Sequence, residues 1–219
     1  MLLVAVLSSA LAATPTHATM ESANWQQLTT KSHSVAGEIG VWHAMVAGSD
    51  CFRGTAVAKD ATPNELLEVV SDIVGAKEWS HAGVTEAQVL ATSGNHIEYY
   101  QYLDVPGWTM ASDRFWFCEA DLVRGDTKAT FKWDRLVDGG DHKSTWDSVK
   151  ANHSNAVEPP LNVGGWFFEK KSDGTHISYE ICTHPGGTIP VAIQNAATRR
   201  TLPDTVGDVI KEAGRRSGR

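Results

Sequence analysis

The alternation of apolar and polar residues predicts a long antiparallel sheet with helices before and after it. Two alternating runs, "VWHAMVAG" and "FRGTAVAKD", indicate two strands near the start of the fold. Further strand-like runs follow, separated by turn signals. They are "GVTEAQVLATSGN", "HIEYYQYLDV", "RFWFCEADLVRGD", "KATFKWDRLVDGG", "STWDSVKANHS", "GGWFFEKKSDG" and "THISYEICTHPGG".

The breaks between these runs have the residues of tight turns, so we expect antiparallel hairpins. These breaks are Ser93-Gly94-Asn95, Arg124-Gly125-Asp126, Asp138-Gly139-Gly140 and Ser172-Asp173-Gly174.

Helical spacing is found in three places. A first helix is expected around residues 22–30, and a second in "DATPNELLEVVSDIVGAKEW", where Thr62 is a cap and Pro63 begins the first turn. The last helix follows Gly186-Gly187, and a kink is expected at Pro203. Its apolar positions are Ile189, Ile193, Ala196, Ala197, Val206, Val209, Ile210 and Ala213. This order predicts an α+β fold in which the last helix covers one face of the sheet.

Composition narrows the possible functions. The chain has 219 residues and a net charge of -7, so it is long enough for a sizeable core and is not expected to bind nucleic acid. Eight Trp is a high number, and indoles line apolar pockets as well as cores. No metal-ligand spacing of His or Cys, serine-nucleophile motif or phosphate-binding loop is present, so we expect no metal site, cofactor or catalytic residue.

The first residues resemble a secretory signal. An apolar run, Leu2 to Leu7, leads to two cleavage patterns, Ala10-Leu11-Ala12 and Thr16-His17-Ala18. The run is too short to span a bilayer, and no basic residue precedes it, so the start lies upstream or the signal is atypical. The alternative is a short N-terminal helix of the mature fold. We expect a signal peptide at 1–18, a domain at 21–219, and a secreted or periplasmic protein.

Export places the three cysteines, Cys51, Cys118 and Cys182, in oxidising surroundings. An odd number cannot all pair within the chain, so at most one disulfide is expected and the rest should be buried. The sequence does not determine whether a disulfide forms.

The order of elements and several motifs resemble the START domain (steroidogenic acute regulatory protein-related lipid transfer) of the Bet v 1-like helix-grip superfamily. The resemblance extends from about Trp25 to about Ala213. The motifs are "GVWHAMV", "FRGTAVAKDATPNELLEVVSD", "KEW", "IEYYQYLDVPG", "SDRFWF", "GGWFFEK", "THISYEI" and "HPGGTIPVAIQN". The resemblance implies a curved antiparallel sheet wrapped around a long C-terminal helix, with one lipid-sized ligand in a tunnel between them.

In this family the loop between the two central strands gates the tunnel, and here that loop is "VPGWTMAS". The resemblance therefore suggests that Trp108 and Met110 cover the tunnel mouth or touch a membrane. The alternative is that Trp108 packs in the core. Family members often bury an acid–base pair on the flanking strands; the matching positions, Tyr100 and Glu119, do not carry it.

Two registers are open for these flanking strands. In the first, Tyr100 and Tyr102 face the tunnel together with Phe115, Phe117 and Glu119. In the second, Trp116, Cys118 and Ala120 face inward, and Glu119 and Asp121 are in solvent. The predicted ligand-binding residues follow the first register and are completed by Trp133, Trp166 and Ile193. Asp113 and Arg114 are interpreted as structural.

The function expected from this resemblance is binding, with transfer, of one lipid or sterol-like molecule by a monomer that touches membranes transiently. The basic C-terminal segment from Arg199 either complements the helix dipole or attracts anionic lipid. One alternative is a cyclase, aromatase or hydrolase that uses the cavity as a reaction chamber, with Glu119 and Tyr100 as the acid–base candidates. Another is a scaffold that binds a protein through the sheet.

Overall fold

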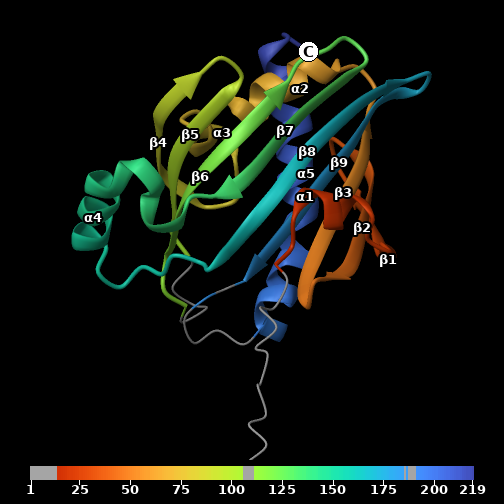
Figure 1. The fold of residues 1–219 in the computed structure, drawn as a ribbon. Helices are drawn as coiled ribbons and strands as arrows, with labels where there is room; N and C mark the ends of the chain where they lie inside the picture. Colours follow the sequence, from red (N-terminus) through yellow and green to blue (C-terminus); the bar gives the residue numbers. More distant parts are fainter. Residues whose placement is uncertain (1–13, 106–110, 185, 187–190) are drawn as a thin grey trace, which may run out of the picture.

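A computed structural model describes residues 14–105, 111–184, 186 and 191–219. Its nine antiparallel strands form one sheet in the order β1-β2-β3-β9-β8-β7-β6-β5-β4 (Figure 1). The strands are β1 Gln26–His33, β2 Gly37–Val46, β3 Ser49–Ala58, β4 Val84–Ser93, β5 His96–Leu103, β6 Arg114–Val123, β7 Lys128–Arg135, β8 Leu161–Lys171 and β9 Gly174–His184. The helices are α1 His17–Glu21, α2 Pro63–Ser71, α3 Ala76–Trp79, the 3-10 turn η2 Val137–His142, α4 Lys143–Asn152 and α5 Val191–Arg216.

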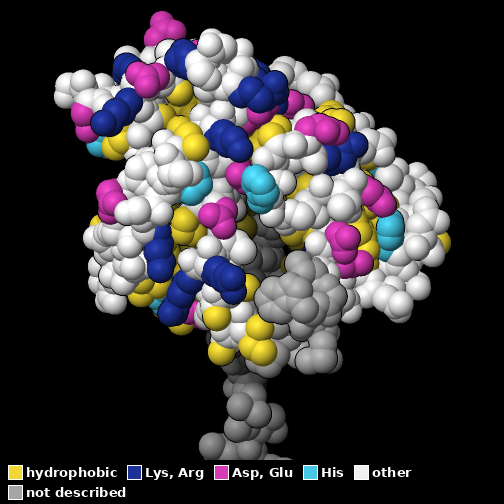
Figure 2. Space-filling model, turned by 180° about the vertical axis from the view of Figure 1, so that it is seen from behind, with side chains coloured by type: hydrophobic (Ala, Val, Ile, Leu, Met, Phe, Trp, Pro, Cys, Tyr) yellow, Lys and Arg dark blue, Asp and Glu magenta, His cyan; other side chains and the backbone are white. Residues whose placement is uncertain are grey.

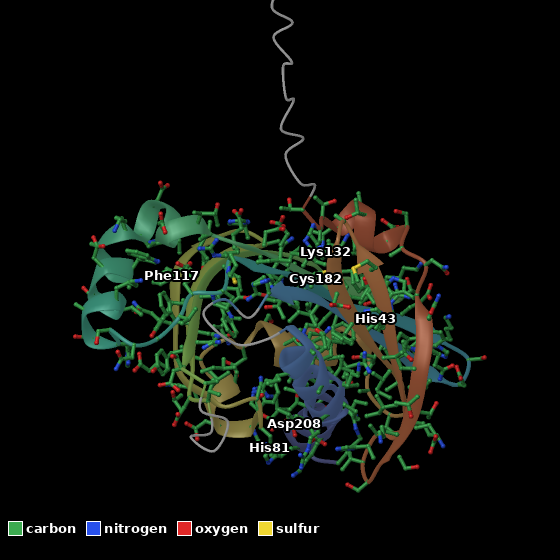
Figure 3. The ribbon with its side chains drawn as sticks, turned by 90° about the horizontal axis from the view of Figure 1, so that it is seen from below. His43, His81, Phe117, Lys132, Cys182 and Asp208 are labelled. Carbon is green, nitrogen blue, oxygen red and sulfur yellow. A yellow bond between two sulfur atoms is a disulfide. The ribbon has the colours of Figure 1, made fainter. Side chains whose placement is uncertain are left out.

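The sheet curves around α5, so it has an inner face toward that helix and an outer face away from it (Figures 1 and 3). The main core fills the inside, where apolar side chains of β2 to β9 meet α2 and α5. On the outer face α4 covers β5 and β6, and α1 covers part of β2, β3 and β9. The predicted α+β helix-grip class is confirmed. Within the described ranges, no helix is long and apolar enough to cross a membrane.

The predicted N-terminal signals of α2 are present. The Thr62 hydroxyl accepts from the backbone N–H of Glu65 at 3.2 Å, and the Glu65 carboxylate accepts from the Thr62 N–H at 2.7 Å. Pro63 occupies the first turn, and Leu66 and Leu67 are fully buried. This capping box starts the helix where the sequence predicts it.

Gly54 allows α5 to lie close to β3. A Cβ atom at this position would come within 2.4 Å of the Leu202 side chain and 2.9 Å of Val206. Both of these side chains are buried in the main core. The close approach of helix and sheet therefore depends on the missing side chain.

Three expectations about local structure were wrong. Residues 26–33 form the edge strand β1 and not a helix, because their backbone pairs with β2. The run "STWDSVKANHS" is mostly the helix α4, whose Trp146 and Val149, three residues apart, lie against the sheet. The predicted hairpin turn at 138–140 is instead the 3-10 turn that leads into α4. Pro203 lies inside α5, which is one continuous helix, and Ile189 is outside the described residues.

Cys51 and Cys182 form a disulfide between β3 and β9. They are directly opposite each other in the strand register, and Met20 of α1 packs in the same buried cluster. Cys118 is a buried free thiol, and burial raises its pKa. The expectation of at most one disulfide is thereby confirmed.

Charged side chains tie the end of α5 to α2. Arg216 Nη2 lies 2.6 Å from Asp72 Oδ2, and Arg215 and Arg216 both donate to the buried carboxylate of Glu212. The hydrogen bond from Arg215, followed by that from Arg216, lowers the pKa of Glu212 to about 2 against the opposing effect of burial.

Because the pKa of Glu212 is lower in the folded protein than in the unfolded chain, its ionised carboxylate stabilises the fold at pH values above the unfolded pKa. This stabilisation is lost as the pH falls toward 2. We expect Glu212→Gln to lower the free energy of unfolding at pH 7 by about 1–2 kcal/mol, since the guanidinium partners are partly in solvent. Urea unfolding from pH 7 to pH 2 should show this difference shrinking below pH 4.5. Glu169→Gln, which removes an exposed partner of Lys128, is the control and should have little effect. A difference that does not change with pH would show that Glu212 acts through packing.

Candidate functional site

Aromatic rings form a continuous wall on the inner face of the sheet. Tyr179 of β9 lies between two indoles, with ring centroids 4.3 Å from Trp166 and 6.1 Å from Trp133. The row continues from Trp133 to Phe131 at 6.1 Å and from Phe131 to Tyr99 at 6.3 Å. Such rings have large apolar surfaces with few polar atoms, the character of a wall for a hydrophobic ligand.

The position of Trp133 is fixed by two neighbours. Its indole N–H donates to the buried Asn162 side chain at 3.0 Å. A Cβ atom on Gly164 would come within 2.3 Å of the Trp133 ring, so the absence of a side chain there lets the ring lie across β8. The amide of Asn162 also lies 3.9 Å from the Cys118 sulfur, which hydrogen-bonds Tyr99. These contacts fix the position of the Trp133 ring within the inner wall.

Several side chains of this inner wall are only half-buried. Tyr179, Ile181 and Trp116 pack against the main core yet keep accessible surface. Gln101 is directly opposite Trp116 in the register and is also half-buried. Burial still raises the pKa of Tyr179, so its hydroxyl is surrounded by protein. Part of the surface of each of these four side chains is therefore not covered by protein.

The structure selects the second of the two registers. Tyr100, Tyr102, Phe115 and Phe117 are buried on the outer face, where they pack with Val149 and Ala156 beneath α4 (Figure 3). Tyr100 donates to Glu86 at 2.8 Å, and Tyr102 donates to Asp113 at 2.5 Å. Burial, followed by the hydrogen bond to the carboxylate, raises the pKa of each tyrosine. The expectation that these four residues face the tunnel is corrected: they attach α4 to the sheet.

Glu119 is also on the outer face. Its side chain is 44% exposed, and its carboxylate is 3.7 Å from His96. The positions aligned with the family's acid–base pair, Tyr100 and Glu119, therefore both point away from α5. Tyr99 and Cys118 are paired on the inner face instead. Cys118, Ala120 and the half-buried Trp116 face inward, as the second register predicts.

The remaining predicted residues divide into three groups. Trp133 and Trp166 are on the inner wall. Ile193 is 59% exposed on the first turn of α5. Trp108 and Met110 lie outside the described residues. Asp113 has the structural role expected of it, because its carboxylate also accepts from the Val105 backbone at 2.9 Å.

Charged residues line the end of the interior where α5 begins. His43 Nε2 lies 2.6 Å from Asp50 Oδ1, and the ring of His43 contacts Phe52 of the main core (Figure 3). Burial raises the pKa of Asp50, but hydrogen bonds from Asn195 and His43, with the charge of Arg199, lower it overall. Arg135 is similarly paired with Glu158 at 3.1 Å. The ionisable side chains at this end of the interior are therefore paired with one another.

Two described grooves lie outside the interior. The larger, of about 960 Å³, crosses the outer face of the sheet and is lined by polar groups, including Thr55, Thr130 and Ser178. The smaller, of about 600 Å³, lies between β1 and the first half of α5. Its basic residues are Lys31, Arg199 and Arg200, and basic side chains gather over these elements at the lower left of Figure 2. Across the described residues, no cluster of His, Cys, Asp or Glu is arranged to hold a metal ion.

Sequence reasoning missed the roles of Tyr99, Tyr179, Gln101 and Asn162. The alternation in "THISYEI" places Tyr179 on the same face as Ile177 and Ile181, so that signal was available. Tyr99 and Gln101 could have been found by following the second register. Asn162 gave no signal, because a lone Asn at the start of a strand is usually a turn residue.

Comparison with known proteins identifies the fold. No family model matches the sequence. An uncharacterized protein of Pseudomonas aeruginosa is 26% identical over 164 residues, which cover 72% of this chain and 73% of that protein. A STAR-related lipid transfer protein from Xanthomonas axonopodis superposes with a TM-score of 0.68 and 21% identity, covering 86% of this chain and 98% of that fragment.

Human STARD10 superposes with a TM-score of 0.67 and 15% identity, covering 86% of this chain and 72% of that chain. The ZhuI aromatase/cyclase from Streptomyces gives 0.53 and 16% identity, covering 76% of this chain and 94% of that chain. A STAR-related lipid transfer protein and an aromatase/cyclase are thus among the proteins that share this fold.

Proposed function

We propose, from the START-type fold of this chain, that the protein binds a single lipid or sterol-like molecule between its sheet and α5 and transfers it between membranes. The observation that carries this proposal is the inner wall of aromatic side chains, some of which keep accessible surface although protein surrounds them. Burying apolar ligand surface there gains roughly 25 cal/mol per Å². The STAR-related lipid transfer protein among the structural neighbours supports the same function.

The basic groove beside α5 supports transient membrane contact. The whole chain carries a net charge of -7, so an anionic membrane would repel it at long range. Lys31, Arg199 and Arg200 provide a local positive surface near the start of α5. Basic residues near an anionic surface contribute about 1 kcal/mol each. This contact would hold the end of the interior that carries His43 close to the bilayer.

Native mass spectrometry of the purified protein tests the binding proposal. We expect a one-to-one complex whose extra mass disappears after organic extraction. Ile181→Trp should reduce the bound fraction, because the larger side chain fills inner space. Val123→Trp is the matched control, since Val123 is exposed on the outside. Wild-type protein that carries no ligand and takes none from lipid vesicles would refute the proposal.

A second candidate is an enzyme that uses the interior as a reaction chamber. The pair His43–Asp50 favours it, because the carboxylate orients an imidazole that faces the interior. The measurement is the mass of the extracted ligand before and after long incubation with the protein. A mass change that His43→Gln slows by roughly 100-fold or more would favour the enzyme. A chemically unchanged ligand favours binding and transfer.

We further propose that the protein is exported and that its signal is cleaved after Ala12. The Cys51–Cys182 disulfide supports an oxidising compartment. Cleavage after Ala18 would remove Thr16, which caps α1, and cut the helix that carries the buried Met20. N-terminal sequencing of the exported protein should begin at Ala13. A first residue of Thr19 would contradict this site, and an intact Met1 would contradict export.

A further inference from the structure

A straight row of mostly small side chains crosses the outer face of the sheet. The strand registers place its members directly opposite one another from β2 to β7, and they are Gly40, Thr55, Ser178, Phe167 and Thr130. Direct cross-strand neighbours are about 5 Å apart, so the row is about 20 Å long. All of its members line the larger outer groove, of about 960 Å³. The row is therefore the floor of that groove.

Longer, charged side chains form the two sides of the groove. They stand two residues away from the row on the same strands and point to the same face. Arg53, Glu180 and Lys132 are on one side, and His176, Glu169 and Lys128 are on the other. Short side chains between two rows of long ones explain why this part of the sheet is hollowed.

Phe167 is an aromatic ring on the solvent side of the sheet. It is half-buried, and none of the apolar clusters of the described residues includes it. A Cβ atom on Gly165 would come within 2.9 Å of the ring, so the ring leans along β8 over this glycine. Lys132 Nζ is 5.5 Å from the ring centroid. An aromatic surface without an apolar cover is thus available in the middle of the groove.

Hydroxyl groups on both sides of this ring can still form hydrogen bonds. The Thr130 hydroxyl makes no side-chain hydrogen bond within the described ranges. Thr55 accepts from the Trp42 indole at 3.0 Å, and its own proton remains available to donate. Ser178 donates to Glu180 at 3.2 Å and can still accept. Hydroxyls that both donate and accept are matched by a ligand that also carries hydroxyls.

Arg53, which lines the same groove, has an unpaired donor. Its Nη2 lies 2.7 Å from Glu180, but its buried Nε has no hydrogen-bond partner among the described residues. A buried donor without a partner costs about 1–3 kcal/mol, and native proteins seldom keep one unless a ligand or water satisfies it. This orphaned donor is a separate indication that a polar ligand binds here.

The charges beside the groove do not favour an ionic ligand. Arg53 is paired with Glu180, and Lys128 is paired with Glu169 at 2.8 Å. His176 lies 2.8 Å from Asp173. An anion or a cation would therefore have to compete with partners that are already in place.

Two other occupants fit the groove poorly. An apolar lipid would cover the hydroxyls of Thr55, Ser178 and Thr130 without giving them a partner. An extended peptide would need free backbone groups to join the sheet as a new strand. The strands β3, β9, β8 and β7 are each already paired on both sides.

We propose that this outer groove binds an uncharged oligosaccharide that lies across the strands. The C–H groups on one face of a sugar ring would pack on the Phe167 ring, whose face is electron-rich. The sugar hydroxyls would exchange hydrogen bonds with Thr130, Thr55 and Ser178. This second site is on the opposite face of the sheet from α5, so it does not depend on the proposed lipid-binding function.

Calorimetric titration of the full, disulfide-bonded chain tests this proposal with three uncharged probes: cellohexaose, maltohexaose and chitohexaose. We expect at least one of them to bind. Phe167→Ala should weaken that binding by about tenfold or more, through lost ring contact. Thr130→Val, which keeps the side-chain shape, should weaken it by about three- to tenfold, the effect of one hydrogen bond.

Val123→Ala is the matched control. Val123 is directly opposite Thr130 at the end of the same row and is exposed, but it does not line the groove. This variant should bind the hexasaccharide like the wild type. Urea unfolding of each variant checks that it is folded, and all of them should keep their lipid in native mass spectrometry, because these positions face away from α5.

Four results would overturn the inference while leaving the proposed function intact. The first is that none of the three hexasaccharides binds. The second is binding that survives both Phe167→Ala and Thr130→Val. The third is tighter binding of the acidic hexagalacturonate than of any uncharged probe, which would mean that the groove recognises charge. The fourth is a dimer in sedimentation that Phe167→Ala dissociates, which would assign the groove to a second copy of this chain.

Discussion

Replacing both Cys51 and Cys182 with alanine is expected to lower the free energy of unfolding by about 5 kcal/mol. The disulfide closes a loop between residues 131 positions apart in the sequence, so it removes a large part of the unfolded chain's conformational freedom. It also joins β3 to β9, strands from opposite ends of the chain that are neighbours in the sheet. Typical domains have stabilities of about 5–15 kcal/mol, so this loss would leave a marginal protein.

Urea unfolding with and without dithiothreitol measures this effect. Reductant should destabilise the wild type by about the same amount as the double substitution and should not affect the double variant further. Cys118→Ala is the matched control, because it removes a buried thiol but keeps the disulfide. That variant should remain sensitive to reductant. If the oxidised and reduced wild-type proteins were equally stable, the Cys51–Cys182 disulfide would not stabilise the fold.

The same measurement bears on the proposed export. Protein made in a reducing cytosol should contain three free thiols and unfold at lower urea concentration than protein recovered from an exporting cell. Thiol titration of the exported protein under denaturing conditions should then find one free thiol. Three free thiols in exported material would contradict the connection between this disulfide and the compartment.

Much of the fold could be predicted because local signals and the fold agree. The capping residues Thr62 and Pro63 mark the start of α2, and glycine-containing turns mark three of the hairpins. The apolar positions of the last helix identify the element around which the sheet curves. These signals depend only on nearby residues, and nothing in the tertiary structure overrides them.

The register of β6 could not be predicted, because both faces of that strand are covered. Phe115 and Phe117 meet α4, while Cys118 and Ala120 meet the main core. A strand buried on both sides has no polar face to show which side is inside. The error had a second cause: "STWDSVKANHS" was predicted to be a strand. Without α4 as a cover, the aromatic face of β5 and β6 had no place except the tunnel.

Neighbouring residues of β6 provide the sharpest test of this assignment. Phe117 is fully buried beneath α4, so Phe117→Ala should lower the free energy of unfolding by about 3–5 kcal/mol. The Phe117→Ala variant should bind the fluorescent apolar probe N-phenyl-1-naphthylamine with nearly unchanged affinity, because the Phe117 side chain points away from the interior.

Trp116→Ala should have the opposite effect. Trp116 is half-buried and faces α5, so its removal should destabilise the fold less than Phe117→Ala and weaken probe binding by about tenfold or more, through lost apolar contact. Urea unfolding of both variants measures stability, and titration with the probe measures binding. The titrations are made without urea, at a temperature where each variant is folded. Loss of binding in Phe117→Ala but not in Trp116→Ala would mean that the ligand lies beneath α4, and the site would move to the outer face. The inner site requires that Phe117→Ala mainly lowers stability and that Trp116→Ala mainly weakens binding. A register shift of one residue would exchange the two faces of the strand, and the two variants would then exchange their effects.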